Sequence, residues 1–226
     1  MICFAGEALR SPIWFEAQAN VLYDLASEEN VDGLIIWGGG LAQYVDPEEV
    51  RILCEQYRPL PMVNGALPLE GIPSILVDNY QGMRDAIGHL TEVHGYRRIA
   101  FIRGPEGHPE AEERYRAYAE VLAEYGLPLD LNLVAPGEFS AFSGAAAIAL
   151  LLDQRKADFE AVVAADDATA VGAIGELRAR GIRMPSDVAV VGFDDIEEAK
   201  SVAPPPSTVW WSGFWPWWAT SSPWGM

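Results

Sequence analysis

Four carboxylates stand in two pairs, Asp166–Asp167 and Asp194–Asp195. Each pair directly follows a run of valine and alanine that predicts a buried strand. Carboxylates placed there can accept hydrogen bonds from ligand hydroxyl groups, act as general acids, or coordinate Mg²⁺. Neighbouring parallel strands end at the same edge of a sheet, where α/β proteins bind their ligands. We therefore expect Asp166 and Asp194 to face one small-molecule site.

The stretch that holds both pairs predicts a strand, a helix and a second strand. Val162–Ala165 and Val188–Val191 are the strands, and the helix between them ends at Gly181. Strands and helices alternate along the whole chain, which is typical of parallel sheets covered on both faces. The other expected strands are Ile2–Ala5, Val31–Trp37, Pro61–Asn64, Ser74–Asp78, Tyr96–Arg103 and Asn132–Val134. The other expected helices are Trp14–Glu28, Asp46–Tyr57, Asn79–His94, Glu110–Tyr125 and Gly144–Leu152.

This alternation predicts an α/β protein with two doubly wound, flavodoxin-like subdomains and a ligand cleft between them. The expected division lies near Tyr96, with residues 1–96 in the first subdomain and 97–203 in the second. Residues 204–226 begin with three consecutive prolines, contain six of the eight tryptophans and carry no charged side chain. We expect this tail to lie outside the fold, as from an out-of-frame translation. An aromatic interaction patch is the alternative.

The composition excludes several classes of partner. The formal net charge is −18, with 33 acidic against 15 basic residues, which argues against binding to nucleic acid or to anionic membranes. The two cysteines, Cys3 and Cys54, have no metal-binding or redox spacing, so we expect buried, reduced thiols. No signal peptide or apolar membrane span is visible. A cytoplasmic protein is expected.

Signatures of catalysis are absent from the sequence. It contains no P-loop, no G-x-S-x-G and no H-E-x-x-H motif, so we expect no enzyme, no cofactor and no metal. The three glycines Gly38–Gly40 follow an expected strand and suggest a phosphate cradle, but they do not fit G-x-G-x-x-G and a tight turn is the simpler interpretation. Phosphoryl transfer at the four carboxylates is the enzymatic alternative.

A series of motifs in order resembles the effector-binding core of the lac repressor and galactose repressor family, which shares its fold with periplasmic sugar-binding proteins. The motifs include VDNYQGMRDAIGHL from Val77, HGYRRIAFIRGP from His94, ERYRAYAEVLAEYGLP from Glu113, GEFSAFSG from Gly137, VVAADDATAVGA from Val162, RGIRMPSDVAVVGFDD from Arg180 and PPPSTV from Pro204. The resemblance covers nearly all residues before Trp210. It implies a small-molecule sensor that dimerises through its core.

The sequence also departs from that family. The chain begins at what would be the second strand, so the first subdomain is expected to be incomplete, with a gap in its sheet. The operator-reading helices of the family are not seen, and the tryptophan tail replaces the return into the first subdomain. The family usually has Asn where Asp166 stands.

The resemblance implies that six residues contact the effector. Arg114 would clamp a sugar hydroxyl or a carboxylate with its planar fork of donors, and the alternative is a surface ion pair with Glu110. Asp194 would accept two sugar hydroxyls, or would cap the following helix. The other candidates are Asp166 as an acceptor or helix N-cap, Phe139 as a stacking ring or core residue, His108 as a polar contact or solvated loop residue, and Gln81 in a ligand loop.

These patterns favour the effector-binding domain of a transcription regulator, with a sugar-like or nucleoside-like ligand and closure of the two halves by a hinge motion. This chain itself would not contact DNA. One alternative is the same sensor joined to a kinase or cyclase output. Another is a fragment without independent function, whose exposed sheet edges would aggregate.

Overall fold

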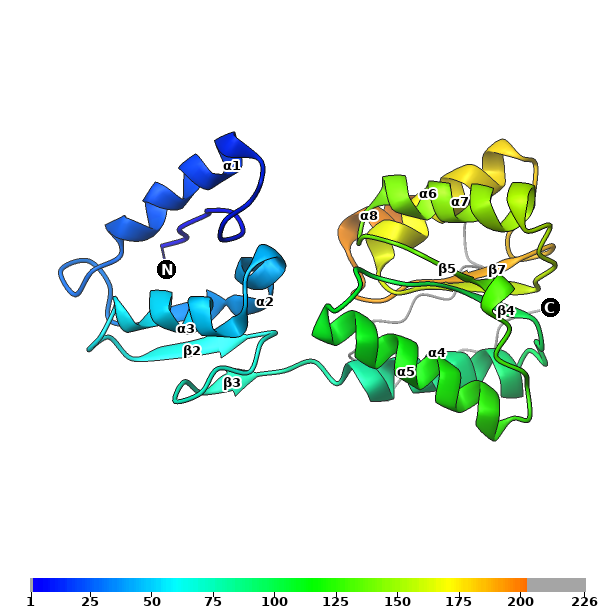
Figure 1. Ribbon diagram of the computed structural model, residues 1–226, viewed down its shortest axis with the longest axis horizontal. Helices are drawn as coiled ribbons and strands as arrows, with labels where there is room; N and C mark the ends of the chain where they lie inside the picture. Colours follow the sequence, from blue (N-terminus) through cyan, green and yellow to red (C-terminus); the bar gives the residue numbers. More distant parts are fainter. Residues whose placement is uncertain (1, 203–226) are drawn as a thin grey trace. The chain divides into compact units, whose positions relative to one another are not determined.

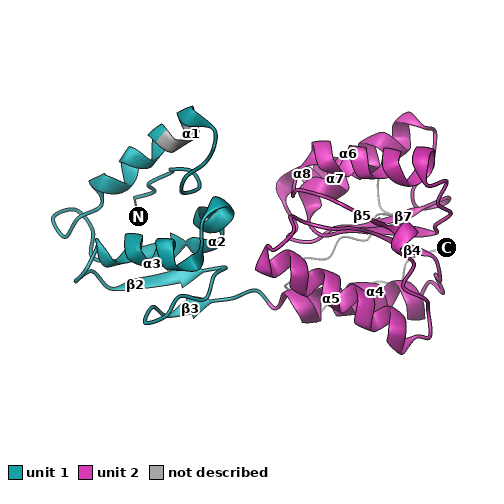
Figure 2. Ribbon diagram, viewed as in Figure 1, with its two compact units in different colours: residues 1–77 teal, residues 78–226 magenta. Residues whose placement is uncertain are grey.

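The computed structural model describes residues 2–202. These residues divide into two compact units, with the boundary between Val77 and Asp78 (Figures 1 and 2). The sequence predicted this division near Tyr96. The boundary falls earlier because the helix α4 (Asn79–Glu92) packs against α5 (Pro109–Glu124) of the second unit. The tail at 204–226, predicted to lie outside the fold, is outside the described residues.

The second unit contains a four-stranded parallel sheet in the order β5-β4-β6-β7. Helices α4 and α5 cover one face, and the other face is covered by α6 and α7, with α8 beside α7 (Figure 1). This is the predicted doubly wound α/β fold. The remaining bounds are β4 (Ile99–Ile102), β5 (Val134–Ala135), β6 (Ala161–Ala164), β7 (Ala189–Val191), α6 (Ala141–Ala149) with a π-helical extension (Leu150–Gln154), α7 (Asp167–Ala179) and α8 (Glu197–Val202).

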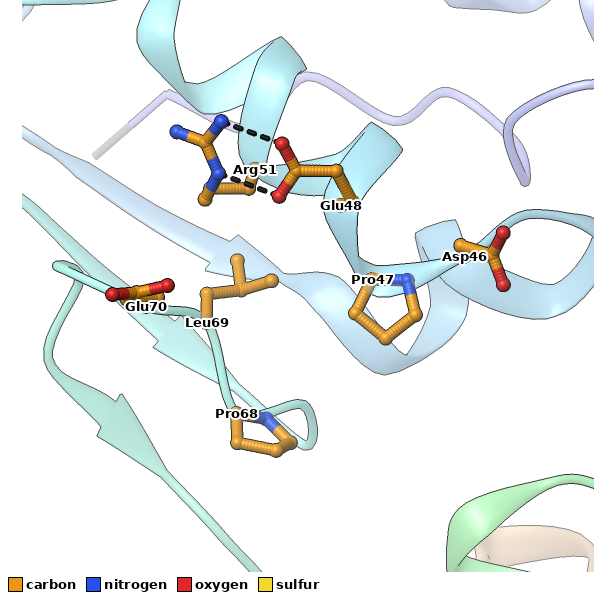
Figure 3. A pocket seen from close by; sticks show the side chains of 7 residues that line it. All are labelled: Asp46, Pro47, Glu48, Arg51, Pro68, Leu69 and Glu70. Carbon is orange, nitrogen blue, oxygen red and sulfur yellow. Dashed lines mark hydrogen bonds and ion pairs between the residues drawn. The ribbon is translucent and has the colours of Figure 1, made fainter.

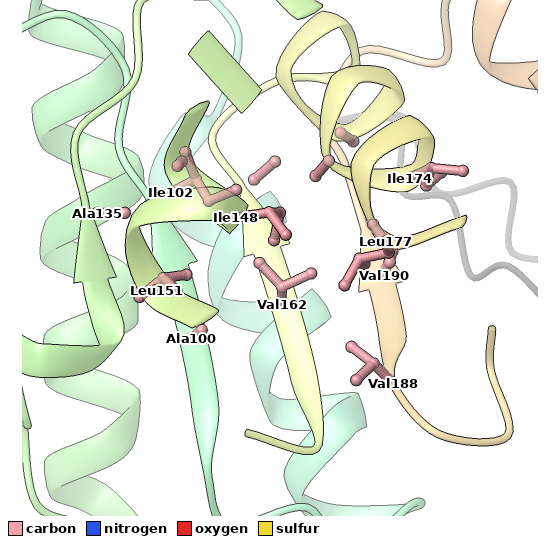
Figure 4. Close-up of a cluster of buried hydrophobic side chains, with 14 of the residues drawn as sticks. Ala100, Ile102, Ala135, Ile148, Leu151, Val162, Ile174, Leu177, Val188 and Val190 are labelled. Atoms are coloured by element: carbon pink, nitrogen blue, oxygen red, sulfur yellow. The ribbon is translucent and has the colours of Figure 1, made fainter. Parts of the chain in front are cut away.

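The strands of this sheet are apolar on both faces, so every residue of β4, β6 and β7 is buried. Ile148 of α6 and Leu177 of α7 meet Val162 and Val190 of the sheet in one core cluster (Figure 4). Helix α7 begins after the N-cap Asp166 and is closed by Gly181 with φ +74°. Both features follow from the sequence pattern.

The order of the strands fixes where a ligand site can form. Strand β4 pairs with β5 on one side and with β6 on the other. The chain therefore winds in opposite directions from this point, and the loops after β4 and β6 diverge. Such a switch point opens a crevice outside the carboxyl ends of the two strands.

The first unit is a smaller parallel sheet, β1-β2-β3, built from β1 (Leu34–Trp37), β2 (Met62–Gly65) and β3 (Ser74–Ile75). Its core contains Val50 and Cys54 of α3 (Pro47–Glu55), as well as Leu67, Leu69 and Ile72. The remaining helical segments are α1 (Trp14–Ala19), the 3-10 helix η1 (Asn20–Leu25), the one-turn helix α2 (Gly38–Leu41) and the 3-10 turn η2 (Ala42–Tyr44).

Several predictions for this unit were wrong. Ile2–Ala5 forms no strand, and Cys3 is exposed whereas Cys54 is buried as predicted. The segment has no hydrogen-bonded partner strand in the described chain, and β propensity alone does not make a strand. The long helix expected over Trp14–Glu28 is α1 followed by η1, and its apolar residues Phe15 and Leu25 are exposed. Neither side chain belongs to the core cluster of this unit in the described residues.

The three glycines after β1 form no phosphate cradle. Gly38 donates its backbone N–H to Oδ1 of Asn64 on the neighbouring strand, at 2.9 Å. A Cβ at Gly38 would lie 2.3 Å from that oxygen, so only glycine allows this contact. The expected tight turn is instead the one-turn helix α2.

No helix among residues 2–202 is both long and apolar enough to cross a bilayer.

Candidate functional site

Arg114 is the centre of a polar cluster at the carboxyl ends of the strands in the second unit. It lies on α5 and is only 3 % exposed. Its Nε donates to Oδ1 of Asn79 at 2.8 Å, and its Nη1 donates to the backbone oxygen of Ala165 at 2.7 Å, directly after β6. The expected alternative is right about the ion pair with Glu110, which is present at 4.0 Å, but wrong about the surface position, because Arg114 is buried. The guanidinium is fixed by three different elements.

Asp194 is the acidic partner of this arginine. Its Oδ1 lies 3.3 Å from Nη2 of Arg114, and 41 % of its side chain is accessible. Desolvation raises the pKa of Asp194 to about 6, while Arg114 opposes the rise and Asp166 and Glu110 add to it. At neutral pH the group is mostly ionised, so it offers acceptor oxygens to a ligand.

Asp166 lies at the same edge of the sheet, as the sequence predicted. Its Oδ1 accepts the backbone N–H of Thr169 at 3.0 Å and so caps α7. It is 7 % exposed, and its charge raises the pKa of Asp194. The N-cap role is thus real, and it leaves the second carboxylate oxygen near the cluster.

Two aromatic rings frame the guanidinium. Arg114 stacks over the buried ring of Phe193 at 3.9 Å, while the ring of Phe139 is 6.0 Å away. Phe139 has φ +51°, and its ring meets that of His108 edge-on at 5.1 Å. Such contacts hold a cation next to an apolar surface.

His108 stands immediately before α5 and is half-buried. Its Nδ1 is buried and without a hydrogen-bond partner, which is not the environment of a solvated loop residue. Desolvation lowers the pKa of His108, Glu110 opposes this and Arg114 adds to it. The ring is thus neutral near pH 7 and borders the cluster.

Gln81 is not brought into the cluster by any contact. Its side chain donates to Asp85 along α4 at 2.6 Å, and its backbone N–H is capped by Asp78. The residue from this turn that does reach Arg114 is Asn79, which the sequence analysis missed. An amide directly after a strand and at the start of a helix is the signal that could have found it.

Two surface depressions in the described chain lie away from the cluster. One, of about 470 Å³, is lined by Asp46, Pro47, Glu48, Arg51, Pro68, Leu69 and Glu70 (Figure 3). Its single cation, Arg51, is already paired with Glu48 at 2.6 Å. The other, of about 290 Å³, lies between α4 and α5 near His89 and Tyr125. Neither combines a buried polar group with an aromatic surface, as ligand sites do.

Metal ligation has no comparable support. No group of three or more His, Cys, Asp or Glu side chains among residues 2–202 is arranged to hold an ion.

Residues 87–212 match the family described as periplasmic binding protein-like domain. The chain belongs to this family. It is similar to the HTH-type transcriptional regulator CelR of Thermobifida fusca, with 39 % identity over 80 % of this chain and 52 % of that protein. This chain therefore spans about half the length of the curated relatives that it matches.

Solved structures in this family confirm the fold. A transcriptional regulator of LacI family from Burkhoderia phymatum is 30 % identical, covers 83 % of this chain and 66 % of its own, and has a TM-score of 0.69. A structure described as a transcriptional regulator CelR–cellobiose complex is 30 % identical, with 90 % and 68 % coverage and a TM-score of 0.62. The resemblance to the lac repressor family is thus confirmed, and the relatives are regulators rather than enzymes.

Proposed function

We propose that this chain is the effector-binding core of a LacI-type transcriptional regulator and that Arg114, Asp194 and Asp166 bind its effector. The observation that supports this most strongly is the buried Arg114, which three elements hold in place at the switch point of the second sheet. Three of its five N–H donors have acceptors in these contacts. The other two are the donors that we propose for the effector.

The charges around this arginine favour a neutral, hydroxyl-rich effector. The guanidinium of Arg114 lies within 4.0 Å of the carboxylates of Asp194 and Glu110, and Asp166 adds a third negative charge near Asp194. An anionic effector would add a further negative charge to this surplus, whereas sugar hydroxyls donate to carboxylates and accept from the arginine. The half-buried ring of Phe139 provides a face for the apolar side of a sugar or nucleoside.

Calorimetry of the 226-residue chain tests this function. The ligands are cellobiose, chosen because a similar protein was solved with it, a neutral nucleoside, and glucuronate as the anionic sugar. We expect binding by at least one neutral ligand and none by glucuronate. Binding by glucuronate alone, or by no ligand with a cooperatively melting protein, would contradict the proposal.

A pair of variants tests whether the ligand binds at the cluster around Arg114. Asp194→Ala removes an acceptor of two hydroxyls and should weaken neutral ligands about 100-fold or more, since hydrogen bonds to charged groups contribute about 1.5–3 kcal/mol each. Asp187→Ala is the matched control, because this carboxylate pairs with Arg183 on the surface at 2.7 Å. The control should bind like the unmodified chain.

Other parts of the expected function are proposals as well. Binding of an operator by the complete regulator, dimerisation through the core, a cytoplasmic location and closure of the two halves around the effector stay predictions from the sequence. Effector binding without turnover is also proposed, because the cluster contains no nucleophile with an adjacent base. A ligand recovered unchanged after incubation with the chain would agree with this.

A further inference from the structure

The loop between β7 and α8 carries Asp194 in a backbone conformation that needs support. Asp194 has φ +104° and the next residue, Asp195, has φ +58°. Residues with a side chain rarely adopt this left-handed region, because Cβ crowds the neighbouring carbonyl group. Two such residues in a row persist only where surrounding contacts hold them.

Those contacts come from Asp167, which the proposed effector site does not otherwise use. Its side chain is fully buried, and its Oδ2 accepts the backbone N–H of Ile196 at 3.0 Å. Its own backbone N–H donates to the carbonyl group of Phe193 at 2.8 Å. One residue at the start of α7 therefore holds both ends of the two-residue stretch that bears Asp194.

The packing at Gly192 shows how closely this carboxyl group fits the loop. A Cβ built on Gly192 would lie 2.1 Å from Oδ1 of Asp167, a distance that atoms in contact do not reach. That oxygen is buried and has no hydrogen-bond partner. The carboxyl group thus pays a desolvation cost that the bond to Ile196 only partly offsets.

The loop also contacts the polar cluster around Arg114 and helix α8. The ring of Phe193, one residue before Asp194, packs under the guanidinium of Arg114 at 3.9 Å. The carboxylate of Asp195 lies 3.8 Å from Nζ of Lys200 on α8. Displacement of the loop from Asp167 would therefore move Asp194 relative to Arg114.

We propose that Asp167 is a positioning residue of the effector site, whose buried carboxyl group holds the loop 192–196 so that Asp194 meets Arg114. The inference rests on the proposed function only for its effect on ligand affinity. The effect on the loop itself does not depend on any ligand.

Ionised neighbours make the same contact sensitive to pH. Desolvation raises the pKa of Asp167 to about 7, the backbone N–H groups of Ile196 and Asp195 oppose this, and Asp194 and Asp166 add to it. Either protonation state keeps an oxygen that can accept from Ile196. As the pH rises through about 7, however, a third negative charge joins those of Asp194 and Asp166, which favours separation of the loop from α7.

The test compares Asp167→Ala, which loses the acceptor, with Asp167→Asn, which keeps an acceptor but no longer titrates. Amide hydrogen exchange of the full chain without ligand is the first measurement. We expect the Ile196 amide to exchange at least about tenfold faster in Asp167→Ala, as for loss of one hydrogen bond. In Asp167→Asn it should stay protected, and the pH dependence that wild type shows near 7 should be absent.

Affinity for the neutral ligand found by calorimetry is the second measurement. We expect Asp167→Ala to bind at least about tenfold more weakly and Asp167→Asn to bind nearly like wild type, without the pH dependence. Asp187→Ala is again the control for removal of a surface carboxylate. Should wild type bind no ligand, the exchange experiment still decides the role of Asp167.

Two results would overturn the inference. One is an Ile196 amide that stays equally protected in Asp167→Ala. The other is a pH dependence of loop exchange near 7 that persists in Asp167→Asn. If Asp167→Ala does not fold, Asp167→Asn and its pH profile carry the test alone.

Discussion

Both units of this protein contain a parallel sheet, but the two sheets differ in how far their side chains are buried. In the second unit, helices cover both faces, and every residue of β4, β6 and β7 is buried. In the first unit, β1 alternates partly buried and exposed residues, and the apolar side chains of Ile35 in β1 and Ile75 in β3 are 86 % and 71 % exposed. A strand with a continuous apolar run needs two covered faces, and only one unit supplies them in the described residues.

This contrast bears on where the proposed effector site lies. The cluster needs side chains that are held within a few tenths of an ångström, and a close-packed scaffold supplies this rigidity. Arg114, Asp166 and Asp194 all lie on or next to elements of the doubly covered sheet. The polar depression of the first unit, around Arg51, has an exposed ion pair instead.

The largest expected effect tests the packing difference between the units. Leu177→Ala removes a fully buried side chain of α7, and we expect the free energy of unfolding to fall by about 4 kcal/mol because a cavity remains. Leu25→Ala in η1 of the first unit is the control, since that side chain is 56 % exposed. Urea denaturation followed by circular dichroism measures both. Equal effects of the two substitutions would remove the contrast.

The next effect concerns the cluster. Arg114→Leu removes the cation and leaves the acidic groups around it uncompensated, so we expect the free energy of unfolding to fall by about 3 kcal/mol. This is the lower end of the range for broken buried pairs, because Asp194 keeps contact with water. Arg116→Leu, on the exposed face of the same helix, is the matched control and should change stability by less than about 0.5 kcal/mol. A stability loss shared by both variants would indicate a helix effect, not a cluster effect.

The pH dependence of stability should be concentrated in the second unit. Desolvation raises the pKa values of Asp167 and Asp194 to about 7 and about 6, well above the ordinary value of an aspartate side chain. The folded state therefore binds protons that the unfolded state has released, and stability declines as the pH rises from about 4 to about 7. We expect a clear loss of stability over this range for the unmodified chain and a smaller loss for Asp167→Asn, because that variant keeps only the contribution of Asp194. Urea titrations at several pH values check this, and a rise in stability over that window contradicts it.

The smallest effect concerns the open sheet face of the first unit. Ile35→Thr replaces an exposed residue and should change the free energy of unfolding by less than about 0.5 kcal/mol. Ile102→Thr places the same change in a fully buried strand of the second unit and should cost several times more. Thermal melts of the two variants compare the faces directly. A large loss in Ile35→Thr would mean that this face is covered in solution.

The sequence predicted the second unit well for a physical reason. Val162–Ala165 and Val188–Val191 are uninterrupted apolar runs, and the structure has strands within one or two residues of both. The cap at Asp166 and the stop at Gly181 depend on local chemistry, which a sequence displays. By contrast, the prediction of a strand at Ile2–Ala5 was wrong, because a strand needs a neighbouring strand to pair with and no local sequence pattern reveals one.

The candidate site was predicted only in part. Arg114, Asp194, Asp166, Phe139 and His108 came from motif and position, and the structure brings these five residues together. The role of Phe193 could not be predicted, because it depends on which helix packs beside which strand. Asn79 was missed although its place at the start of an expected helix could have marked it. Asp167 was seen only as one half of an acidic pair. Its contact with Ile196 joins segments 29 residues apart.

A crystal structure of the chain with a saturating neutral sugar tests the central claim most directly. We expect sugar hydroxyl groups within about 2.7–3.2 Å of both the Asp194 carboxylate and the Arg114 guanidinium. The opposite result is a sugar bound elsewhere, such as in the depression around Arg51, with no sugar atom in contact with Arg114 or Asp194. That result would contradict the proposed effector site.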